Sequence, residues 1–336
     1  MSKIKVAING FGRIGRNVFK IALERQDIEL VGINDLTDTK TLAHLLKYDS
    51  TQGKFPGTIE VTENSMIING VNIPVHAERK PSQIPWTSTP DVVIESTGVF
   101  TSKESEKGGY GDHLKNGAKK VILTVPSKDK IDRTIVIGVN NEDLKSEDQC
   151  VSNASCTTNC LAPIVKILND NFGIENGFMT TIHAYTNDQM ILDAPHKDLR
   201  RARAAAVSQI PTTTGAAKTV GKVIPELNGK LDGMAIRIPT PTGSCVDFVA
   251  NLKKEVTKEE INNAVKKAAE STMKGVVEYT EDPIVSVDII HNTHSSIFDA
   301  QSTMVLGKTI KILSWYDNEW GYSCRVVDLI PMLFKK

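Results

Sequence analysis

The thiol of Cys156 has the clearest chemical role that this sequence offers, because its position predicts the start of a helix. Residues 150–153 are typical of a short strand, and residues 161–168 repeat apolar side chains at helical spacing. Unpaired backbone N–H groups and the helix dipole lower the pKa of a thiol at such a position and favour the thiolate, the nucleophilic form. We therefore predict that Cys156 is a nucleophile. The alternative is a small buried hydrophobic residue.

His183 is the residue best placed to assist this thiol. It follows a predicted strand at 177–182, and a helix predicted at 161–171 lies between that strand and Cys156. In such a compact unit the start of the helix and the end of the next strand can meet, so topology favours a Cys–His pair. The competing histidines are His44, His76, His113, His196, His291 and His294.

A glycine pattern near the N-terminus predicts a dinucleotide site. Gly10, Gly12 and Gly15 form G-x-G-x-x-G directly after a predicted strand at 5–8 and at the start of a helical stretch. The glycines allow a tight turn, close backbone approach to a pyrophosphate, and close packing of helix on strand. Asp35 ends the second predicted strand at the spacing expected for a ribose 2′-hydroxyl partner, which favours NAD over NADP. The alternative is a glycine turn with an unrelated surface aspartate.

A nucleophilic cysteine beside a nicotinamide indicates aldehyde oxidation. Addition of the thiolate gives a tetrahedral adduct, a hydride leaves to NAD, and a thioester remains. A histidine would act as general base, and backbone N–H groups near Cys156 would stabilise the oxyanion. The residues themselves leave the acyl acceptor open.

Donor groups in the second half of the chain suit phosphate oxygens. They are Thr186, Arg200, Arg201, Arg203, residues 212–215 and Arg237. For the arginine run a solvated charge patch or a subunit contact is an equally good interpretation. No aromatic residues alternate with these charges, so nucleic acid is not favoured.

The elements that must position these groups divide the chain into two fold types. Residues 4–139 alternate short apolar strands with helical stretches, which predicts a Rossmann-type, doubly wound α/β domain with a mainly parallel sheet. Asn69 and Gly70 predict a hairpin inside it. After about residue 150 the strands lengthen, which predicts an α+β domain with a mainly antiparallel sheet. Residues 257–260 form a capping box for a helix through Ser271, and a last helix is expected at 319–333.

Composition excludes several classes of protein. The chain has 336 residues, with 40 Lys+Arg balanced by 40 Asp+Glu, so no global field recruits nucleic acid or a membrane. Its five cysteines are too few for a disulfide framework, and because their number is odd they cannot all be paired. The N-terminus lacks a secretory pattern, so we expect a cytoplasmic protein. No metal is predicted, because His291 and His294 lack the partners of a ligand set.

Taken together, these motifs closely resemble the glyceraldehyde-3-phosphate dehydrogenase family, the phosphorylating enzymes of glycolysis, over essentially the whole length. The resemblance rests on residues 7–16, 154–159, 181–186, 200–205, 214–217 and 315–321. It implies that Cys156 is the nucleophile and His183 the base. Beyond the glycines, the implied NAD contacts are Arg13, Ile14, Asp35, Arg79, Thr124 and, at the nicotinamide amide, Asn318. The implied contacts to substrate phosphate or inorganic phosphate are Ser155, Thr157, Thr186, Arg201, Thr214, Gly215 and Arg237.

The resemblance further implies a reaction and an assembly. The reaction converts D-glyceraldehyde 3-phosphate, NAD and inorganic phosphate to 1,3-bisphosphoglycerate and NADH, with phosphate attacking the thioester. The assembly is a homotetramer, in which the loop at 188–203 packs near a neighbour's cofactor. Residues 1–154 and the C-terminal helix 319–336 would form the NAD-binding domain, and residues 155–318 the catalytic domain.

Two departures and two alternatives accompany the resemblance. Residues 107–112 form a small insertion, and Ala194 stands where many NAD-linked relatives carry leucine. Erythrose-4-phosphate dehydrogenases share the cysteine, the histidine and the glycine motif but tend to lose the pair Thr214-Gly215, which this chain keeps. A non-catalytic NAD-binding sensor or interaction protein is the alternative of another class.

Overall fold

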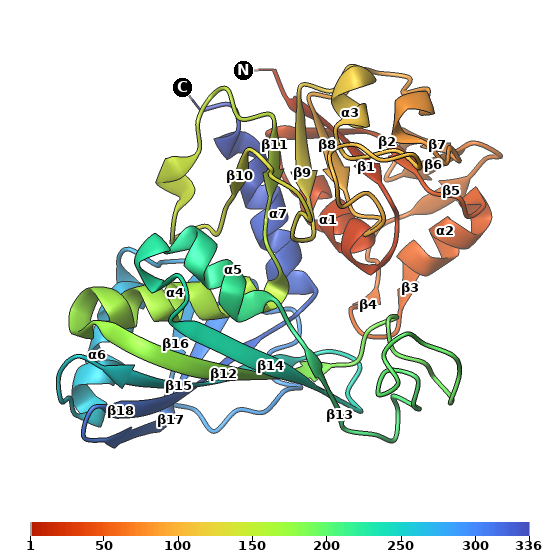
Figure 1. Cartoon of the computed structure of the whole chain (residues 1–336). Helices are drawn as coiled ribbons and strands as arrows, with labels where there is room; N and C mark the ends of the chain where they lie inside the picture. Colours follow the sequence, from red (N-terminus) through yellow and green to blue (C-terminus); the bar gives the residue numbers. More distant parts are fainter. Residues whose placement is uncertain (1, 336) are drawn as a thin grey trace. The chain divides into compact units, whose positions relative to one another are not determined.

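The computed structural model describes residues 2–335 of the chain (Figure 1). These residues form two compact units, each with its own large sheet. The first unit comprises residues 2–135, 142–154 and 323–335. The second comprises residues 136–141 and 155–322.

The first unit is built on a mainly parallel sheet with strand order β10-β11-β9-β8-β1-β2-β7-β6-β5. Neighbours from β10 to β7 run parallel, and the pairs β7–β6 and β6–β5 are antiparallel. The bounds are β1 Ile4–Asn9, β2 Ile28–Asn34, β5 Ile59–Val61, β6 Ser65–Ile68, β7 Val71–His76, β8 Val92–Glu95, β9 Lys120–Leu123, β10 Arg133–Thr134 and β11 Cys150–Ser152. Strand order reverses at β1, so the ends of β1, β2 and β8 border the position where such folds bind nucleotides.

Helices and short elements complete this unit. They are α1 Arg13–Leu23, α2 Thr39–Lys47, α3 Asp112–Lys115, the 3₁₀ segments η1 Pro81–Gln83 and η2 Asn141–Asp143, the hairpin of β3 Tyr48–Asp49 with β4 Gly53–Lys54, and α7 Trp320–Met332. From Ser323 onward α7 belongs to this unit. Its Asp328 forms an ion pair of 3.2 Å with Arg25, just beyond α1. The predicted hairpin is confirmed, since Asn69 and Gly70 have φ values of 51° and 82° and join β6 to β7.

The second unit contains a mainly antiparallel sheet with strand order β13-β14-β12-β15-β18-β17-β16. The pairs β12–β14 and β16–β17 are parallel, and the other neighbours are antiparallel. The strands are β12 Ile174–Ala184, β13 Ile210–Thr213, β14 Leu231–Ile238, β15 Ser244–Leu252, β16 Val277–Thr280, β17 Ser296–Leu306 and β18 Thr309–Tyr316. The helices are α4 Cys156–Phe172, α5 Ala216–Val223, the 3₁₀ segment η3 Pro225–Leu227 and α6 Lys258–Glu270.

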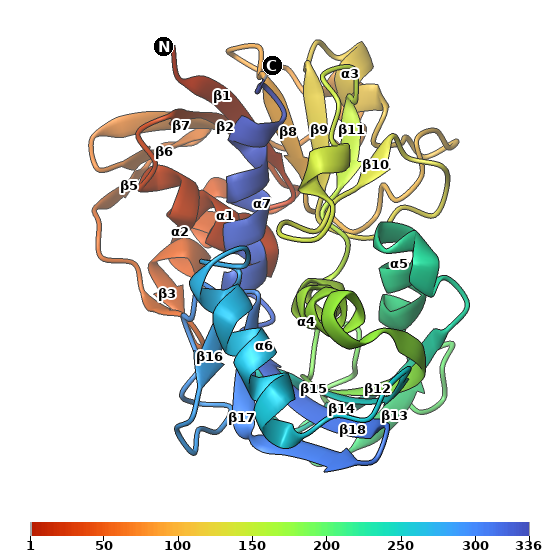
Figure 2. The ribbon, with the colours of Figure 1, turned by 90° about the vertical axis from the view of Figure 1, so that its left-hand side faces the viewer.

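Helices α4, α5 and α6 lie on one face of this sheet (Figures 1 and 2). Strand β12 reflects this arrangement, because buried Met179 alternates with exposed Phe178. Helix α6 begins with the predicted capping box between Thr257 and Glu260. The predicted fold class, a Rossmann-type unit plus a unit with a mainly antiparallel sheet, is therefore confirmed.

Helix α4 begins earlier than its apolar pattern indicates. Its first residue is Cys156, ahead of the apolar repeat at 161–168, and Pro163 lies inside the helix. The difference arises because the first turn, Cys-Thr-Thr-Asn, is polar and carries no hydrophobic period. Its helical state is set by the cap at Ser155 instead.

Candidate active site

The thiol of Cys156 occupies the first position of a capped helix. Ser155 has extended backbone angles and accepts a hydrogen bond from the Thr158 N–H at 3.1 Å through its side-chain oxygen. Ala154, just before it, has a φ of 54°, in the left-handed region that a Cβ disfavours. This tight turn gives the half-buried Cys156 its place at the helix N-terminus, as predicted from the sequence.

His183 lies directly beside the thiol, near the end of β12. Its Nε2 is 3.5 Å from Cys156 Sγ. Its Nδ1 is 2.7 Å from the carbonyl oxygen of Ala184. If Nδ1 carries the proton and donates it to that carbonyl, Nε2 presents a lone pair to the thiol. The predicted Cys–His pair is thus present in the structure.

Arg237 joins this pair through the parallel pairing of β12 with β14, which places His183 and Arg237 in register. The guanidinium Nη1 contacts His183 Nδ1 and donates to the Ala184 carbonyl at 3.1 Å. Its Nε is buried and has no hydrogen-bond partner among the described residues. A positive charge with a spare donor therefore lies beside the imidazole.

Burial leaves the thiol and the imidazole uncharged. Burial and the positive charge of Arg237 lower the pKa of His183 to about 3. Burial also raises the pKa of the Cys156 thiol, although Arg237 and hydrogen bonds from Thr157 act in the opposite direction. The lowered thiol pKa that we expected from the helix start is therefore wrong for this structure, because desolvation outweighs the effect of the helix terminus.

Other predicted phosphate contacts form two further groups. Thr157 and Ser155 lie on either side of Cys156, and the Thr157 hydroxyl is 2.9 Å from the Tyr316 hydroxyl. Arg201 donates to Thr212 at 2.8 Å and contacts Asp188 and Asp198. The remaining candidates are Thr186, whose N–H donates to Gln189 at 2.8 Å, and the pair Thr214-Gly215, which leads into α5. The structure thus links Arg237 directly to the Cys–His pair, while carboxylates already engage Arg201.

The glycine turn of the first unit has the geometry of a dinucleotide cradle. Gly10 has a φ of 91°, and a Cβ added there would lie 2.6 Å from the Thr97 nitrogen. A Cβ on Gly15 would lie 2.1 Å from the Gly10 carbonyl oxygen, so helix and turn pack closely. A Cβ on Gly12 would meet nothing within 4 Å, so this side of the turn is open to a ligand. The residues present therefore fit a pyrophosphate.

The other candidate cofactor contacts differ in their surroundings. Asp35 accepts the N–H groups of Phe11 at 2.8 Å and Thr37 at 3.0 Å, which connects β2 to the glycine turn. Arg13 forms an ion pair of 2.7 Å with Asp49. Ile14 is half-buried, Arg79 is exposed, and Thr124 is buried and donates to the Glu95 carbonyl at 3.2 Å.

Asn318, in the second unit, is a candidate partner for the nicotinamide amide. Its side-chain oxygen accepts the Gly243 N–H at 3.1 Å and the Ser244 hydroxyl at 2.9 Å. Both bonds occupy the oxygen, so the amide NH₂ is the end that can donate to a ligand.

Comparisons with known proteins agree with this geometry. The family described as glyceraldehyde 3-phosphate dehydrogenase, NAD binding domain, matches residues 4–103, and its C-terminal domain matches residues 155–318. The chain is 63% identical to a glyceraldehyde-3-phosphate dehydrogenase of Borreliella burgdorferi over 99% of this chain and 100% of that protein. The chain belongs to the glyceraldehyde-3-phosphate dehydrogenase family. Similar relatives from Geobacillus stearothermophilus and Bacillus cereus are 58% and 57% identical, each over 99% of both chains.

Membership in the glyceraldehyde-3-phosphate dehydrogenase family makes the chain an NAD-dependent oxidoreductase of this type. The predictions of family, enzyme class and cofactor are therefore confirmed. No helix within residues 2–335 is long and apolar enough to cross a membrane. The same residues contain no group of three or more His, Cys, Asp or Glu side chains arranged to hold a metal ion.

Sequence reasoning missed one residue beside the Cys156–His183 pair, Tyr316, whose ring meets the His183 imidazole. Tyr316 is part of the motif at 315–321, but no role was predicted for it. The available signal was its position at the end of a strand whose residues alternate between buried and half-buried. That alternation predicts a buried side chain without indicating what it touches.

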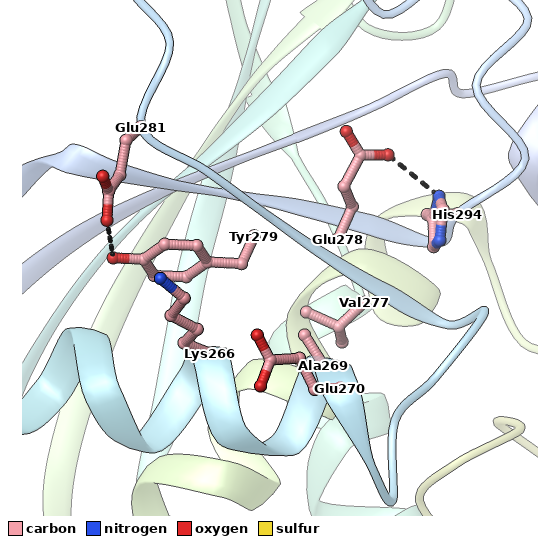
Figure 3. A pocket seen from close by; sticks show the side chains of 8 residues that line it. All are labelled: Lys266, Ala269, Glu270, Val277, Glu278, Tyr279, Glu281 and His294. Atoms are coloured by element: carbon pink, nitrogen blue, oxygen red, sulfur yellow. Dashed lines mark hydrogen bonds and ion pairs between the residues drawn. The ribbon is translucent and has the colours of Figure 1, made fainter.

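A cavity of about 430 Å³ lies elsewhere in the second unit, between α6 and β16 (Figure 3). Its lining includes an ion pair of 3.0 Å between His294 and Glu278, and Tyr279, which donates to Glu281 at 2.9 Å. It contains none of the predicted site residues of the glyceraldehyde-3-phosphate dehydrogenase family.

Proposed function

We propose that this chain catalyses the phosphorylating oxidation of D-glyceraldehyde 3-phosphate, with Cys156 as nucleophile and His183 as general base. The observation that carries the proposal is the 3.5 Å contact between Cys156 Sγ and His183 Nε2 at the first turn of α4. A neutral imidazole at this distance can take the thiol proton at Nε2 as Sγ attacks the aldehyde carbon.

The two side chains account for each proton in the reaction. His183 Nε2 takes the thiol proton while Sγ bonds to the aldehyde carbon. It then returns this proton to the former carbonyl oxygen, which becomes the hydroxyl of a thiohemiacetal. His183 then takes the hydroxyl proton as the carbon loses a hydride, which leaves a thioester on Cys156. A phosphate oxygen attacks the thioester carbon and expels the Cys156 thiolate, giving 1,3-bisphosphoglycerate. NAD supplies the hydride acceptor.

Residues of the first unit would hold this cofactor. Gly10, Gly12 and Gly15 form the cradle for the pyrophosphate, and Asp35 accepts the ribose hydroxyls. Arg13, Ile14, Arg79 and Thr124 would add contacts around the nucleotide, and Asn318 would donate to the nicotinamide amide. A carboxylate at position 35 disfavours the 2′-phosphate of NADP by charge repulsion.

Phosphate groups of the two substrates would bind to donors of the second unit. Arg237 is supported by its buried, unpartnered Nε and by its contact with His183. Gly215 caps α5 without a side-chain hydrogen bond, so backbone donors of this helix start are suited to an anion. The remaining proposed contacts are Ser155, Thr157, Thr186, Arg201 and Thr214.

A phosphate-dependent assay tests the proposal. NADH formation is measured with D-glyceraldehyde 3-phosphate and with erythrose 4-phosphate, with NAD and NADP, and with and without inorganic phosphate. We expect strong phosphate dependence, preference for glyceraldehyde 3-phosphate with NAD, and no turnover in Cys156→Ala. His183→Asn should lower turnover by about 10²- to 10⁴-fold without weakening NAD binding.

Two other functions would give different results in this assay. A higher kcat/KM for erythrose 4-phosphate would indicate an erythrose-4-phosphate dehydrogenase, which the presence of Thr214-Gly215 disfavours. Turnover in Cys156→Ala equal to that of the unaltered chain would remove the thiol from the mechanism. NAD binding without turnover on either substrate would indicate a sensor or interaction protein.

We infer that residues 1–154 with the C-terminal residues 319–336 act as the NAD-binding domain and residues 155–318 as the catalytic domain, in a cytoplasmic homotetramer. Exposed apolar side chains support an oligomer. Phe178, Val249 and Met304 lie in one row across β12, β15, β18 and β17, with Lys311 of β18 between Val249 and Met304, and 71% of Phe178 and 62% of Met304 are exposed. Ile191, Leu192 and Leu199 in the loop at 188–203 are more than three-quarters exposed. Such apolar surface is typical of a subunit interface.

A further inference from the structure

Tyr316 connects the two segments that carry the thiol and the imidazole. It is the last residue of β18, and only 1% of it is exposed. Its hydroxyl oxygen lies 2.9 Å from Thr157 Oγ1, next to Cys156 on α4, and 2.8 Å from Thr181 Oγ1, two residues before His183 on β12. Its ring also meets the His183 imidazole edge-on, with a centroid distance of 5.8 Å.

The direction of these hydrogen bonds follows from counting protons. Thr181 donates its hydroxyl proton to the carbonyl oxygen of Cys245 at 3.3 Å, because a carbonyl can only accept. Tyr316 must then donate to Thr181, and Thr157 must donate to Tyr316, since each hydroxyl has one proton. The result is a directed series of hydrogen bonds from Thr157 to Tyr316, from Tyr316 to Thr181, and from Thr181 to the Cys245 carbonyl. This hydrogen-bond series runs from α4 to the central strands of the sheet.

We propose that Tyr316 is a positioning residue for the Cys156–His183 pair. Its hydroxyl ties the first turn of α4 to β12, and its ring limits the movement of the imidazole. This inference rests on the proposed roles of Cys156 and His183. Proton transfer between Sγ and Nε2 needs their direct contact at 3.5 Å, so separating the two atoms would interrupt it.

The hydrogen-bond series also limits which group of Thr157 can bind a phosphate. Its single hydroxyl proton is engaged by the Tyr316 hydroxyl and the Cys156 thiol, so toward a phosphate this residue offers its backbone N–H and not its hydroxyl proton. Loss of the Tyr316 hydroxyl would release that proton for phosphate. A positioning role therefore predicts a lower kcat without a higher KM for phosphate, a combination that general unfolding of the site would not give.

The test is Tyr316→Phe, which removes the hydroxyl and keeps the ring. We expect alkylation of Cys156 by iodoacetamide and kcat each to fall about 10- to 100-fold, with the KM for inorganic phosphate and the NAD affinity unchanged within about twofold. The rate of alkylation should be measured across pH, because a separated pair shifts the profile as well as the rate. Tyr279→Phe is the matched control, since it removes a hydroxyl that bonds to the exposed Glu281, and it should behave like the unaltered chain.

A second variant keeps the proposal testable if Tyr316→Phe does not fold. Thr181→Val removes the hydroxyl that links Tyr316 to the Cys245 carbonyl, and it should lower both the alkylation rate and kcat. Unaltered alkylation and kcat in either folded variant would overturn the proposal, as would a loss that tracks only a lower unfolding temperature. If Cys156→Ala is inactive while Tyr316→Phe is unaffected, the proposed function stands and only the role of Tyr316 is lost. An active Cys156→Ala removes both.

Discussion

Two buried groups of side chains differ in charge. Cys156 and His183 are neutral, whereas Asp49, paired with Arg13, is ionised. Burial raises the pKa of the Cys156 thiol and lowers that of the His183 imidazole, and the cation beside them, Arg237, disfavours an imidazolium. Asp49 is also buried, which opposes its charge, but the N–H groups of Gln52 and Thr51 and the guanidinium of Arg13 outweigh burial and hold the pKa of its carboxyl well below the usual range. Hydrogen bonding thus decides which buried group is charged at neutral pH.

The charged state of Asp49 makes stability depend on pH. Because its pKa is lower in the folded chain than the ordinary value of about 3.9, the unfolded chain binds the proton more readily. Its stabilising contribution is therefore complete above about pH 4 to 5 and is lost as the pH falls. Asp49→Asn should reduce the free energy of unfolding by about 3 kcal/mol at pH 7, since it leaves Arg13 without its buried partner, and by much less at pH 3. Urea unfolding at both pH values measures this difference.

Asp38→Asn is the control for this prediction. Asp38 caps α2 through a hydrogen bond from the Thr41 N–H at 2.9 Å, and asparagine caps helices equally well. This variant should unfold at the same urea concentration as the unaltered chain at pH 7. Equal stability of Asp49→Asn and the unaltered chain at pH 7 would contradict the charge assignment.

In the turn between β1 and α1, one glycine is needed for stability and another for NAD binding. Gly10 needs a positive φ and has no room for a Cβ, whereas Gly12 has an ordinary φ of −72° and open space beside it. Gly10→Ala should therefore lower the free energy of unfolding by roughly 2 to 5 kcal/mol through strain and contact with Thr97. Gly12→Ala should leave stability within about 0.5 kcal/mol and weaken NAD binding at least about tenfold, because its methyl group projects into the space needed by the pyrophosphate.

Thermal unfolding and NAD titration of the two variants check this prediction. Each serves as the control for the other, because both place the same methyl group in the same turn. Wild-type NAD affinity in Gly12→Ala would show that the open side of the turn does not face the cofactor.

Elements with local signals were predictable from the sequence, and their contacts across the sheet were not. The Asn69-Gly70 hairpin, the Thr257 capping box and the glycine turn each depend on a few consecutive residues. The apolar repeat alone gave no signal for the first turn of α4, because Ser155 caps a polar turn without hydrophobic periodicity, and the helix start at Cys156 was predicted only from its place after a strand. The insertion at 107–112 gave no structural signal either, yet Tyr110 is fully buried and donates to Asp129 at 2.8 Å, which fixes this loop in the first unit.

At the scale of the whole molecule, the sequence likewise did not predict the contacts that distant residues make at the candidate active site. Cys156 and His183 were found because a helix start and a strand end are local features that topology brings together. Arg237 lies against His183 only because β12 pairs in parallel with β14 in one register, and Tyr316 reaches Thr157 only because β18 lies inside the same sheet. Register depends on the packing of complete strands. The neutral state of Cys156 and His183 likewise depends on burial, which cannot be predicted from a short motif.

The proposed homotetramer makes a prediction about the apolar row on the outer face of the second sheet. Phe178→Glu places a carboxylate at the β12 end of this row, next to Val249, and burying it in an interface would cost several kcal/mol. We expect sedimentation to show smaller species for this variant, while Cys156 alkylation per chain stays within about twofold, because Phe178 faces away from the helices that cover the site. Val71→Glu, at an exposed position of β7 in the first unit, is the control and should keep the assembly of the unaltered chain. A Phe178→Glu protein that sediments like the unaltered chain would show that this face is not an interface.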